Sequence, residues 1–257
     1  MSVSPIKKNG LRQNSVSDEE WQLRVDLAAA YRLVAMFGWD DLIFTHISAR
    51  LPGDEDHFLI NPYGMMFEEI TASSLVKIDM DGEIVGTSAY PVNPAGFTIH
   101  SAVHEVRHDA ACVIHLHTAA GTAVATQEEG LMPLNQTSLV IREQIAYHEY
   151  EGIALDHSER PRLQKDLGDK NLMLLWNHGT LALGPSVAEA FLGMYFLERA
   201  CEMQVASLAG DRKLHYPADS VRDLTAQQGT TGLPGIADMA WKALLRKLDR
   251  QMPGYAD

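Results

Sequence analysis

CVIHLHTAAGTAVA, residues 112–125, is the stretch that decides the fold and raises the main functional question. The apolar run from Ala111 to His117 predicts a buried strand, and the small residues at 119–126 predict a helix packed closely against it. His115 and His117 stand two residues apart, so both imidazoles project from the same face of that strand. Two imidazoles on one face make half of a metal site. Alternatively, each ring hydrogen-bonds a backbone carbonyl beneath a covering helix.

A third histidine follows another apolar segment. In LLWNHGTLALG, residues 174–184, His178 comes after a predicted strand at 173–176 and before a short one at 181–183, and Gly179 permits a tight turn. Open α/β sheets place their sites at strand ends, so His178 could converge on His115 and His117. Three histidines with an open position are typical of a catalytic metal that polarises a carbonyl or binds both oxygens of an enediolate. The spacing leaves both interpretations of these histidines open.

Helical and extended patterns alternate outward from these two segments. Ser17 and Glu20 match a capping box, and Gly38 ends the helical periodicity that runs from Trp21 to Phe37. Further expected elements are strands at 47–50 and 58–60, a hairpin of 76–79 with 83–85, and helices at 96–107, 158–167, 186–208 and 237–248. We expect residues 1–16 to be disordered and the polar residues 211–234 to form an extended excursion or a linker. This order favours one α/β domain with helices covering a mixed sheet.

The composition excludes several classes of protein. The chain has 257 residues, 46% of them hydrophobic, which is typical of one globular domain, and its net charge of −13 argues against a nucleic-acid partner. No run reaches the roughly 20 apolar residues of a membrane span, and no secretory signal is visible, so we expect a cytoplasmic protein. Cys112 and Cys201 lie in apolar segments and are expected to be buried thiols. Five histidines among charged or turn residues are expected to be solvated: His57, His104, His108, His157 and His215.

Six motifs in consistent order give the chain a specific resemblance. They are THISAR at 45–50, INPYG at 60–64, TASSLVKID at 71–79, HLHTAAG at 115–121, AYHEYEG at 146–152 and NHGTLALG at 177–184. As a set they resemble the class II aldolase/adducin family, and in detail they are most similar to the branch that contains the adducin head domain. The resemblance implies a three-layer α/β/α sandwich with a largely antiparallel central sheet over 17–210. The segment 211–257 would then be a polar extension and a C-terminal helix packing on the same domain.

The resemblance also implies a cofactor and an assembly. A divalent metal, Zn²⁺ first and Mn, Co or Fe as alternatives, would be held by His115, His117 and His178. The family's aldolases are tetramers with sites near subunit interfaces, so a homo-oligomer acting on a small-molecule substrate is implied, with no membrane partner.

Departures from the aldolase pattern bear on the reaction. At the position of the family's acid/base Glu this chain has Gly96, preceded by Pro94 and Ala95 where the sugar-phosphate aldolases have serines. Glycine cannot transfer a proton, and Pro and Ala have no side-chain donors for a phosphate. The family's Gly-Asn phosphate loop reads Thr45-His46 here, and its Thr/Ser-Gly turn reads Tyr63-Gly64. Ordinary phospho-sugar aldolase chemistry is therefore not expected.

Three functions remain in competition. The first is a metal-dependent lyase that cleaves or decarboxylates a small oxygenated acid or ketone through a metal-stabilised enediolate. The second is a non-catalytic binding module similar to the head domain of adducin, which is a protein of the actin cytoskeleton. The third and weaker alternative is a keto-sugar dehydratase. The lyase needs another group to move the proton, and the candidates in family motifs are His46, Tyr63, His100 and His148, whereas packing is favoured for Tyr147. Candidate substrate-binding residues are Arg50, which could instead form a salt bridge, together with Asn61 and Gly64.

Overall fold

The first long helix, α1 (Asp18–Phe37), begins and ends where local signals predict. In the computed structural model, which describes residues 15–153, 157–210, 213–232 and 234–257, the Ser17 side chain accepts a hydrogen bond from the Glu20 N–H. Gly38 takes the left-handed conformation at the C-terminus of the helix. The expected disorder of residues 1–16 concerns a segment of which 1–14 lie outside the described residues.

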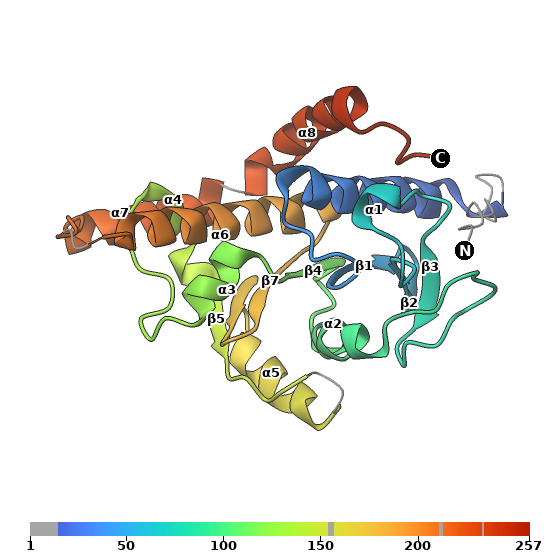
Figure 1. Ribbon diagram of the computed structural model, residues 1–257, viewed down its shortest axis with the longest axis horizontal. Coiled ribbons are helices and arrows are strands. Elements are labelled where there is room, and N and C mark those ends of the chain that lie inside the picture. The colour runs from blue at the N-terminus through green and yellow to red at the C-terminus, as the bar shows by residue number, and fades with distance from the viewer. Residues whose placement is uncertain (1–14, 154–156, 211–212, 233) are drawn as a thin grey trace.

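Within the described residues the strands form one seven-stranded sheet in the order β3-β2-β1-β4-β7-β6-β5 (Figure 1). Their bounds are β1 His46–Leu51, β2 Asp54–Ile60, β3 Val76–Asp79, β4 Cys112–Leu116, β5 Ile145–His148, β6 Leu172–Leu175 and β7 Gly179–Gly184. Strands β5 and β6 pair in parallel, and the other neighbours are antiparallel. The expectation of a largely antiparallel central sheet is confirmed.

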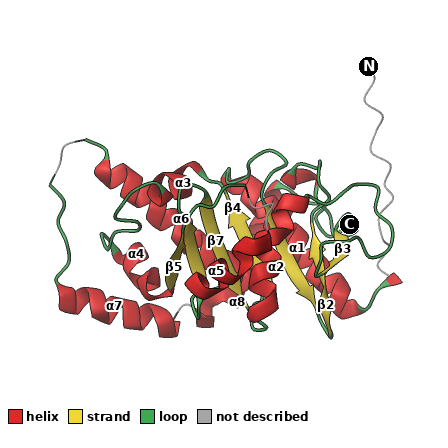
Figure 2. Cartoon of the chain, turned by 90° about the horizontal axis from the view of Figure 1, so that it is seen from below, coloured by secondary structure: helices red, strands yellow, loops and turns green. Residues whose placement is uncertain are grey.

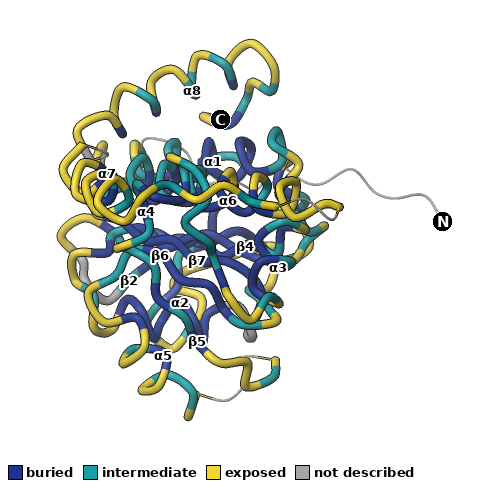
Figure 3. The backbone as a smooth tube through the Cα atoms, turned by 90° about the vertical axis from the view of Figure 1, so that its left-hand side faces the viewer, coloured by how far each residue is buried: buried dark blue, intermediate teal, exposed yellow. Residues whose placement is uncertain are grey.

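Helices cover both faces of this sheet. The remaining helices are α2 Pro94–Val106, α3 Ala119–Ala125, α4 Gln136–Ile141, α5 Arg160–Leu167, α6 Val187–Leu208, α7 Asp219–Gly232 and α8 Ala237–Gln251. Helices α1 and α6 pack on one face, and α2 and α5 lie on the other, where Figure 2 shows them in front of the strands. Figure 3 shows the three layers edge-on, with α8 outside α1 and α6, where Trp241 and Leu248 join the main core. The predicted α/β/α sandwich is confirmed.

Successive side chains along a strand point alternately into the two hydrophobic cores, one on each face of the sheet. On β4, Cys112, Ile114 and Leu116 join the core under α1 and α6, whereas Val113 joins the core under α2 and α5. His115 therefore projects toward the α2 and α5 face. Cys112 and Cys201 are free and buried, as expected. None of the helices in the described ranges combines the length and apolar character needed to span a membrane.

Two expected elements are corrected. Residues 83–85 do not form a strand, because Ile84 makes a single bridge to Ile78 between Gly82 and Gly86, which both have positive φ. Most of the polar segment 211–234 is the helix α7 rather than an extended linker. Its Gly229 allows that helix to cross α4 closely, since a Cβ there would overlap the backbone of Val140. Glycine marks a close helix contact here, not a loop.

The expectation of a solvated His104 is also wrong. Its side chain is fully buried on α2, where its Nε2 lies 2.8 Å from the Ser48 hydroxyl and its Nδ1 lies 3.2 Å from the Ala110 carbonyl oxygen. Charged neighbours in the sequence suggested solvent, but Glu105 is exposed while His104 is buried, and Arg107 and His108 lie beyond the end of α2.

Candidate metal centre

Three histidines reach one point from two neighbouring strands. His115 lies on β4, His117 directly follows that strand, and His178 occupies the turn between β6 and β7. Because β4 and β7 pair antiparallel, the start of β7 lies beside the end of β4. Gly179 makes this approach possible, since a Cβ at that position would overlap the Leu116 carbonyl oxygen.

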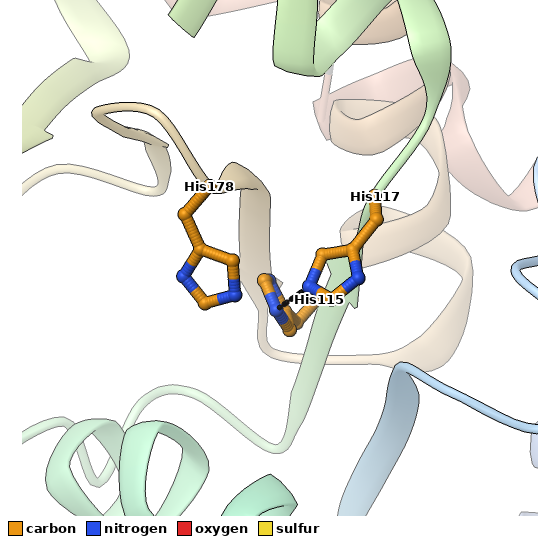
Figure 4. Close-up of side chains that lie close together, drawn as sticks. All are labelled: His115, His117 and His178. Carbon is orange, nitrogen blue, oxygen red and sulfur yellow. Dashed lines mark hydrogen bonds between the residues drawn. The ribbon is translucent and has the colours of Figure 1, made fainter. Parts of the chain in front are cut away.

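The three rings form a nearly equilateral triangle (Figure 4). Their centroids are 4.7 Å apart for His115 and His117, 4.7 Å for His115 and His178, and 4.8 Å for His117 and His178. One ring nitrogen from each residue lies within 4.8 Å of the others. Three imidazoles this close together could hold one divalent ion.

Hydrogen bonds fix which nitrogens face the centre. The His115 Nδ1 lies 3.0 Å from the Thr180 carbonyl oxygen, which only accepts, so Nδ1 carries the proton. The His117 Nδ1 lies 3.2 Å from the Asp41 carboxylate and donates to it in the same way. In the neutral rings both Nε2 atoms then carry lone pairs, and these two atoms are 3.0 Å apart.

Two lone pairs facing each other at this distance repel, and a cation between them would remove that repulsion. Two nitrogens bound tetrahedrally to one zinc ion stand about 3.3 Å apart, close to the separation observed. A proton shared by the two nitrogens is the alternative arrangement for this contact. Burial and the neighbouring His178, His117 and His46 hold the pKa of His115 itself well below its usual value, which favours the neutral form of that ring. The donor set therefore fits a divalent ion.

His178 completes the triangle at the edge of an open cleft. Burial and the neighbouring His117 lower the pKa of His178 to about 4, so its ring is neutral and able to coordinate at neutral pH. The cleft has a volume of about 450 Å³ and is lined by both of these histidines and by Thr122, Tyr150 and Asn177, among others. His115 is thus buried behind the site, whereas His117 and His178 border the open cleft.

A row of buried side chains continues from His115 toward α2. The ring of His46 lies 5.9 Å from that of His115 and 4.0 Å from that of His100, measured between centroids. Ser48 bridges His100 and His104, with its hydroxyl 2.6 Å from the His100 Nδ1.

The hydrogen bonds along this row define the tautomer of His100. Because His104 donates from Nδ1 to Ala110, its Nε2 accepts the Ser48 proton, and Ser48 in turn accepts from the His100 Nδ1. The His100 Nε2 is then unprotonated, and within the described residues it has no hydrogen-bond partner. Desolvation by burial, and then His46, His104 and His115, lower the pKa of His100 strongly.

His148 lies apart from this row. It is on β5, which β6 and β7 separate from β4. Its Nδ1 lies 2.8 Å from the Asp166 carboxylate and its Nε2 lies 3.2 Å from that of Glu159. Both ring nitrogens therefore contact carboxylates on the α5 side of the sheet.

Arg50 and Asn61 are engaged with the protein. The Arg50 guanidinium donates to the backbone carbonyl of His104 and lies 4.9 Å from the centroid of Phe58. Asn61 is buried, and its Oδ1 accepts from the Tyr31 hydroxyl at 2.9 Å.

Tyr63 and Gly64 lie in the turn after β2. The Tyr63 N–H donates to the Pro91 carbonyl, and the exposed Gly64 has a φ of 107°. Gly96 lies in the first turn of α2, four residues before His100 and hence on the same face of that helix.

Sequence reasoning missed three residues around the histidines. Asp41 orients His117, Thr180 orients His115 through its backbone carbonyl, and the ring of Tyr150 lies 6.1 Å from that of His178. Every residue has a backbone carbonyl, so the sequence could not indicate that the carbonyl of Thr180 bonds His115. The acidic pair Asp40-Asp41 shortly before His46 was the one signal available.

The sequence pattern of the Class II Aldolase and Adducin N-terminal domain matches residues 25–205. A protein of Caulobacter vibrioides, provisionally named an aldolase class 2 protein, is 57% identical over 95% of this chain and 96% of its own length. Alpha-adducin of Rattus norvegicus is 43% identical over 96% of this chain, which corresponds to 36% of the adducin.

Two solved structures share the fold. The crystal structure of an aldolase II superfamily protein from Pseudomonas syringae is 48% identical with a TM-score of 0.91, covering 95% of this chain and 98% of that one. The L-fuculose 1-phosphate aldolase of Glaciozyma antarctica is 25% identical with a TM-score of 0.79, covering 91% of this chain and 92% of that one.

Proposed function

The chain belongs to the class II aldolase and adducin family, and we propose that it is a metal-dependent lyase that cleaves or decarboxylates a small oxygenated acid or ketone. The observation that carries the proposal is the pair of Nε2 atoms of His115 and His117 facing each other at 3.0 Å while both Nδ1 atoms donate elsewhere. A divalent ion bound there would act as a Lewis acid on substrate oxygens. We propose His115, His117 and His178 as its ligands.

The donor set favours a borderline ion. Three neutral imidazoles suit Zn²⁺, and also Co²⁺, Mn²⁺ or Fe²⁺, better than the oxygen-loving Mg²⁺ or Ca²⁺. The carboxylate of Asp41 and the carbonyl of Thr180 keep two of the rings in the tautomer that leaves Nε2 available.

We assign proton handling to the buried row rather than to position 96, where glycine has no acid or base. His46 lies between His115 and His100, and the tautomer of His100 leaves its Nε2 as an acceptor. General base catalysis needs an acceptor within hydrogen-bond reach of the reacting proton. His148 is left out of the proposal because carboxylates contact both of its nitrogens.

The cleft favours a substrate without a phosphate group. Among the described residues that line it there is no Lys or Arg, and the polar groups are hydroxyls, an amide and two imidazoles. Phosphate recognition generally uses cationic forks or backbone cradles. We therefore expect hydroxy acids, keto acids or hydroxy ketones to be better substrates than sugar phosphates.

The test is a substrate screen on metal-loaded protein. Purified protein incubated with Zn²⁺, Mn²⁺ or Co²⁺ is given a panel of hydroxy acids, keto acids and hydroxy ketones, and products are followed by mass spectrometry. We expect C–C cleavage or CO₂ release that chelation abolishes, and that is also absent from a folded His115→Ala/His178→Ala variant. Turnover that survives chelation or the double substitution would refute the proposal.

A second candidate is a non-catalytic binding module of the adducin type. The 43% identity to alpha-adducin over nearly the whole chain, together with Gly96 at the acid/base position, favours it. Uptake of the ion with no turnover across the panel would support this candidate over the lyase.

We also propose a cytoplasmic homo-oligomer. Half-exposed apolar side chains on α7, Val221 and Leu224, suit a contact between subunits. Light scattering coupled to gel filtration tests this, and a monomer at micromolar concentration would contradict it.

A further inference from the structure

Glu198 is a fully buried carboxyl group outside the triangle of histidines. It lies on α6 in the main core, on the face of the sheet opposite to His115. One oxygen, Oε2, accepts a hydrogen bond from the Thr118 hydroxyl, and the other, Oε1, accepts from the Thr180 hydroxyl at 2.7 Å. The carboxyl group thus joins the loop after β4 to strand β7.

Both threonines lie next to the histidines. Thr118 directly follows His117, and its hydroxyl oxygen also accepts from the Gly121 N–H at 3.0 Å, which caps α3. Thr180 comes two residues after His178, and its carbonyl oxygen accepts from the His115 Nδ1. Glu198 is therefore linked to all three histidines. Thr118 connects it to His117, and Thr180 connects it to His178 along the chain and to His115 through a hydrogen bond.

The packing around this carboxyl group leaves little room for rearrangement. A Cβ added to Gly121 would stand 2.6 Å from the Thr180 Cγ2, 2.7 Å from the Thr118 Oγ1 and 3.0 Å from the Glu198 Oε1. Three separate elements meet at this point, and glycine is what lets α3 approach them. A displaced Glu198 side chain would consequently move the segments that carry the histidines.

A carboxyl group at this place is costly for the fold. Desolvation by burial raises the pKa of Glu198 to about 7, against the lowering effect of the two threonine hydrogen bonds. An apolar side chain of similar size would avoid that cost.

We propose that Glu198 is a positioning residue that sets the affinity of the three-histidine site for its divalent ion, acting through Thr118 and Thr180. The inference rests on the metal site of the proposed function. Groups hydrogen-bonded directly to metal ligands typically contribute 10- to 100-fold in affinity. Glu198 acts through two threonines, so we expect the lower end of that range.

Gln204 provides a matched control on the same helix. Like Glu198 it is buried and bonds to loop segments, with its Nε2 2.8 Å from the Gly130 carbonyl and its Oε1 2.7 Å from the Met132 nitrogen. These contacts hold residues 127–132 and do not include Thr118 or Thr180. Gln204→Leu should destabilise the fold to a similar degree without touching the histidines.

The experiment measures Co²⁺ and Zn²⁺ affinity by competition with a chelator, alongside urea unfolding of the metal-free protein. We expect Glu198→Leu to bind either ion about 10-fold more weakly, and Gln204→Leu to stay within about threefold of the unsubstituted chain. Glu198→Gln, which keeps one acceptor, should lose less than Glu198→Leu. Thr180→Val should weaken binding in the native background and have little further effect in Glu198→Leu.

Several results would overturn the inference. Folded Glu198→Leu with unchanged affinity would do so, and so would an equal loss in Gln204→Leu. If Glu198→Leu does not fold, Glu198→Gln and Thr180→Val decide, and unchanged affinity in both overturns it. Because no substrate is involved, normal ion binding without turnover refutes only the lyase, whereas an unsubstituted chain that binds no ion overturns both proposals.

Discussion

Gly121→Ala is the sharpest single test of how the histidine-bearing segments pack together. The new methyl group would stand 2.6 Å from the Thr180 Cγ2 and 2.7 Å from the Thr118 Oγ1. Thr180 is within a central strand and Thr118 caps α3, so neither can move away as a flexible chain end could. Overpacking of this kind costs about 1–3 kcal/mol, and the better helix propensity of alanine returns up to about 1 kcal/mol. Since two contacts fall below 3.0 Å, we take the upper end of the overpacking cost, about 3 kcal/mol, and expect a net loss of about 2 kcal/mol in the free energy of unfolding.

Urea unfolding of the metal-free protein, followed by tryptophan fluorescence, measures this loss. Gly232→Ala is the matched control, because a Cβ at that last position of α7 meets nothing within 4 Å. It should leave the free energy of unfolding within about 0.5 kcal/mol of the unsubstituted value. If Gly121→Ala is as stable as Gly232→Ala, the close packing of α3 against β7 described above is wrong.

Three further predictions concern separate parts of the molecule. Burial lowers the pKa of His104 from 6.5 to about 3. Between these two pH values the side chain is protonated in the unfolded chain and neutral in the folded chain. The contribution of neutral His104 to the free energy of unfolding is therefore complete above pH 6.5 and is lost as the pH falls toward 3. Between pH 7.5 and 5 it amounts to about 2 kcal/mol, and urea unfolding of His104→Gln should show a pH dependence weaker by that amount, whereas an identical one would contradict it. Asp41→Ala should weaken Zn²⁺ binding about 10-fold in chelator competition because His117 loses its acceptor, and unchanged affinity would exclude that role. Gly229→Ala should cost about 1–3 kcal/mol because its methyl group would overlap Val140, and a variant of unchanged stability in urea would show that α7 does not cross α4 this closely.

Elements with local signals were predictable from the sequence, and those without were not. The N-cap Ser17 and the left-handed Gly38 bracket α1 where the pattern placed it, and Ser186 does the same at the start of α6. The helix α7 was missed because its Gly and Thr residues are typical of loops. What stabilises it is the close contact of Gly229 with α4, a tertiary effect that no local pattern reveals.

The same distinction applies to the candidate site. The side-chain spacing of His115 and His117 and the turn at His178 pointed to one centre, and the pairing of β4 with β7 brings the three rings together. That all three histidines would share one ion came from the family resemblance, because the spacing alone left their convergence open. Glu198 could not be found from the sequence, because a glutamate on an amphipathic helix is normally solvent-exposed.

The central claim is that His115, His117 and His178 hold one divalent ion, and metal analysis of the purified protein tests it most directly. The unsubstituted chain and the His115→Ala/His178→Ala variant are each measured as purified and after incubation with Zn²⁺, Mn²⁺ or Co²⁺ followed by gel filtration. We predict about one divalent transition-metal ion per chain, lost in the double variant. No retained ion in the unsubstituted chain, or equal retention by the variant, would contradict the claim.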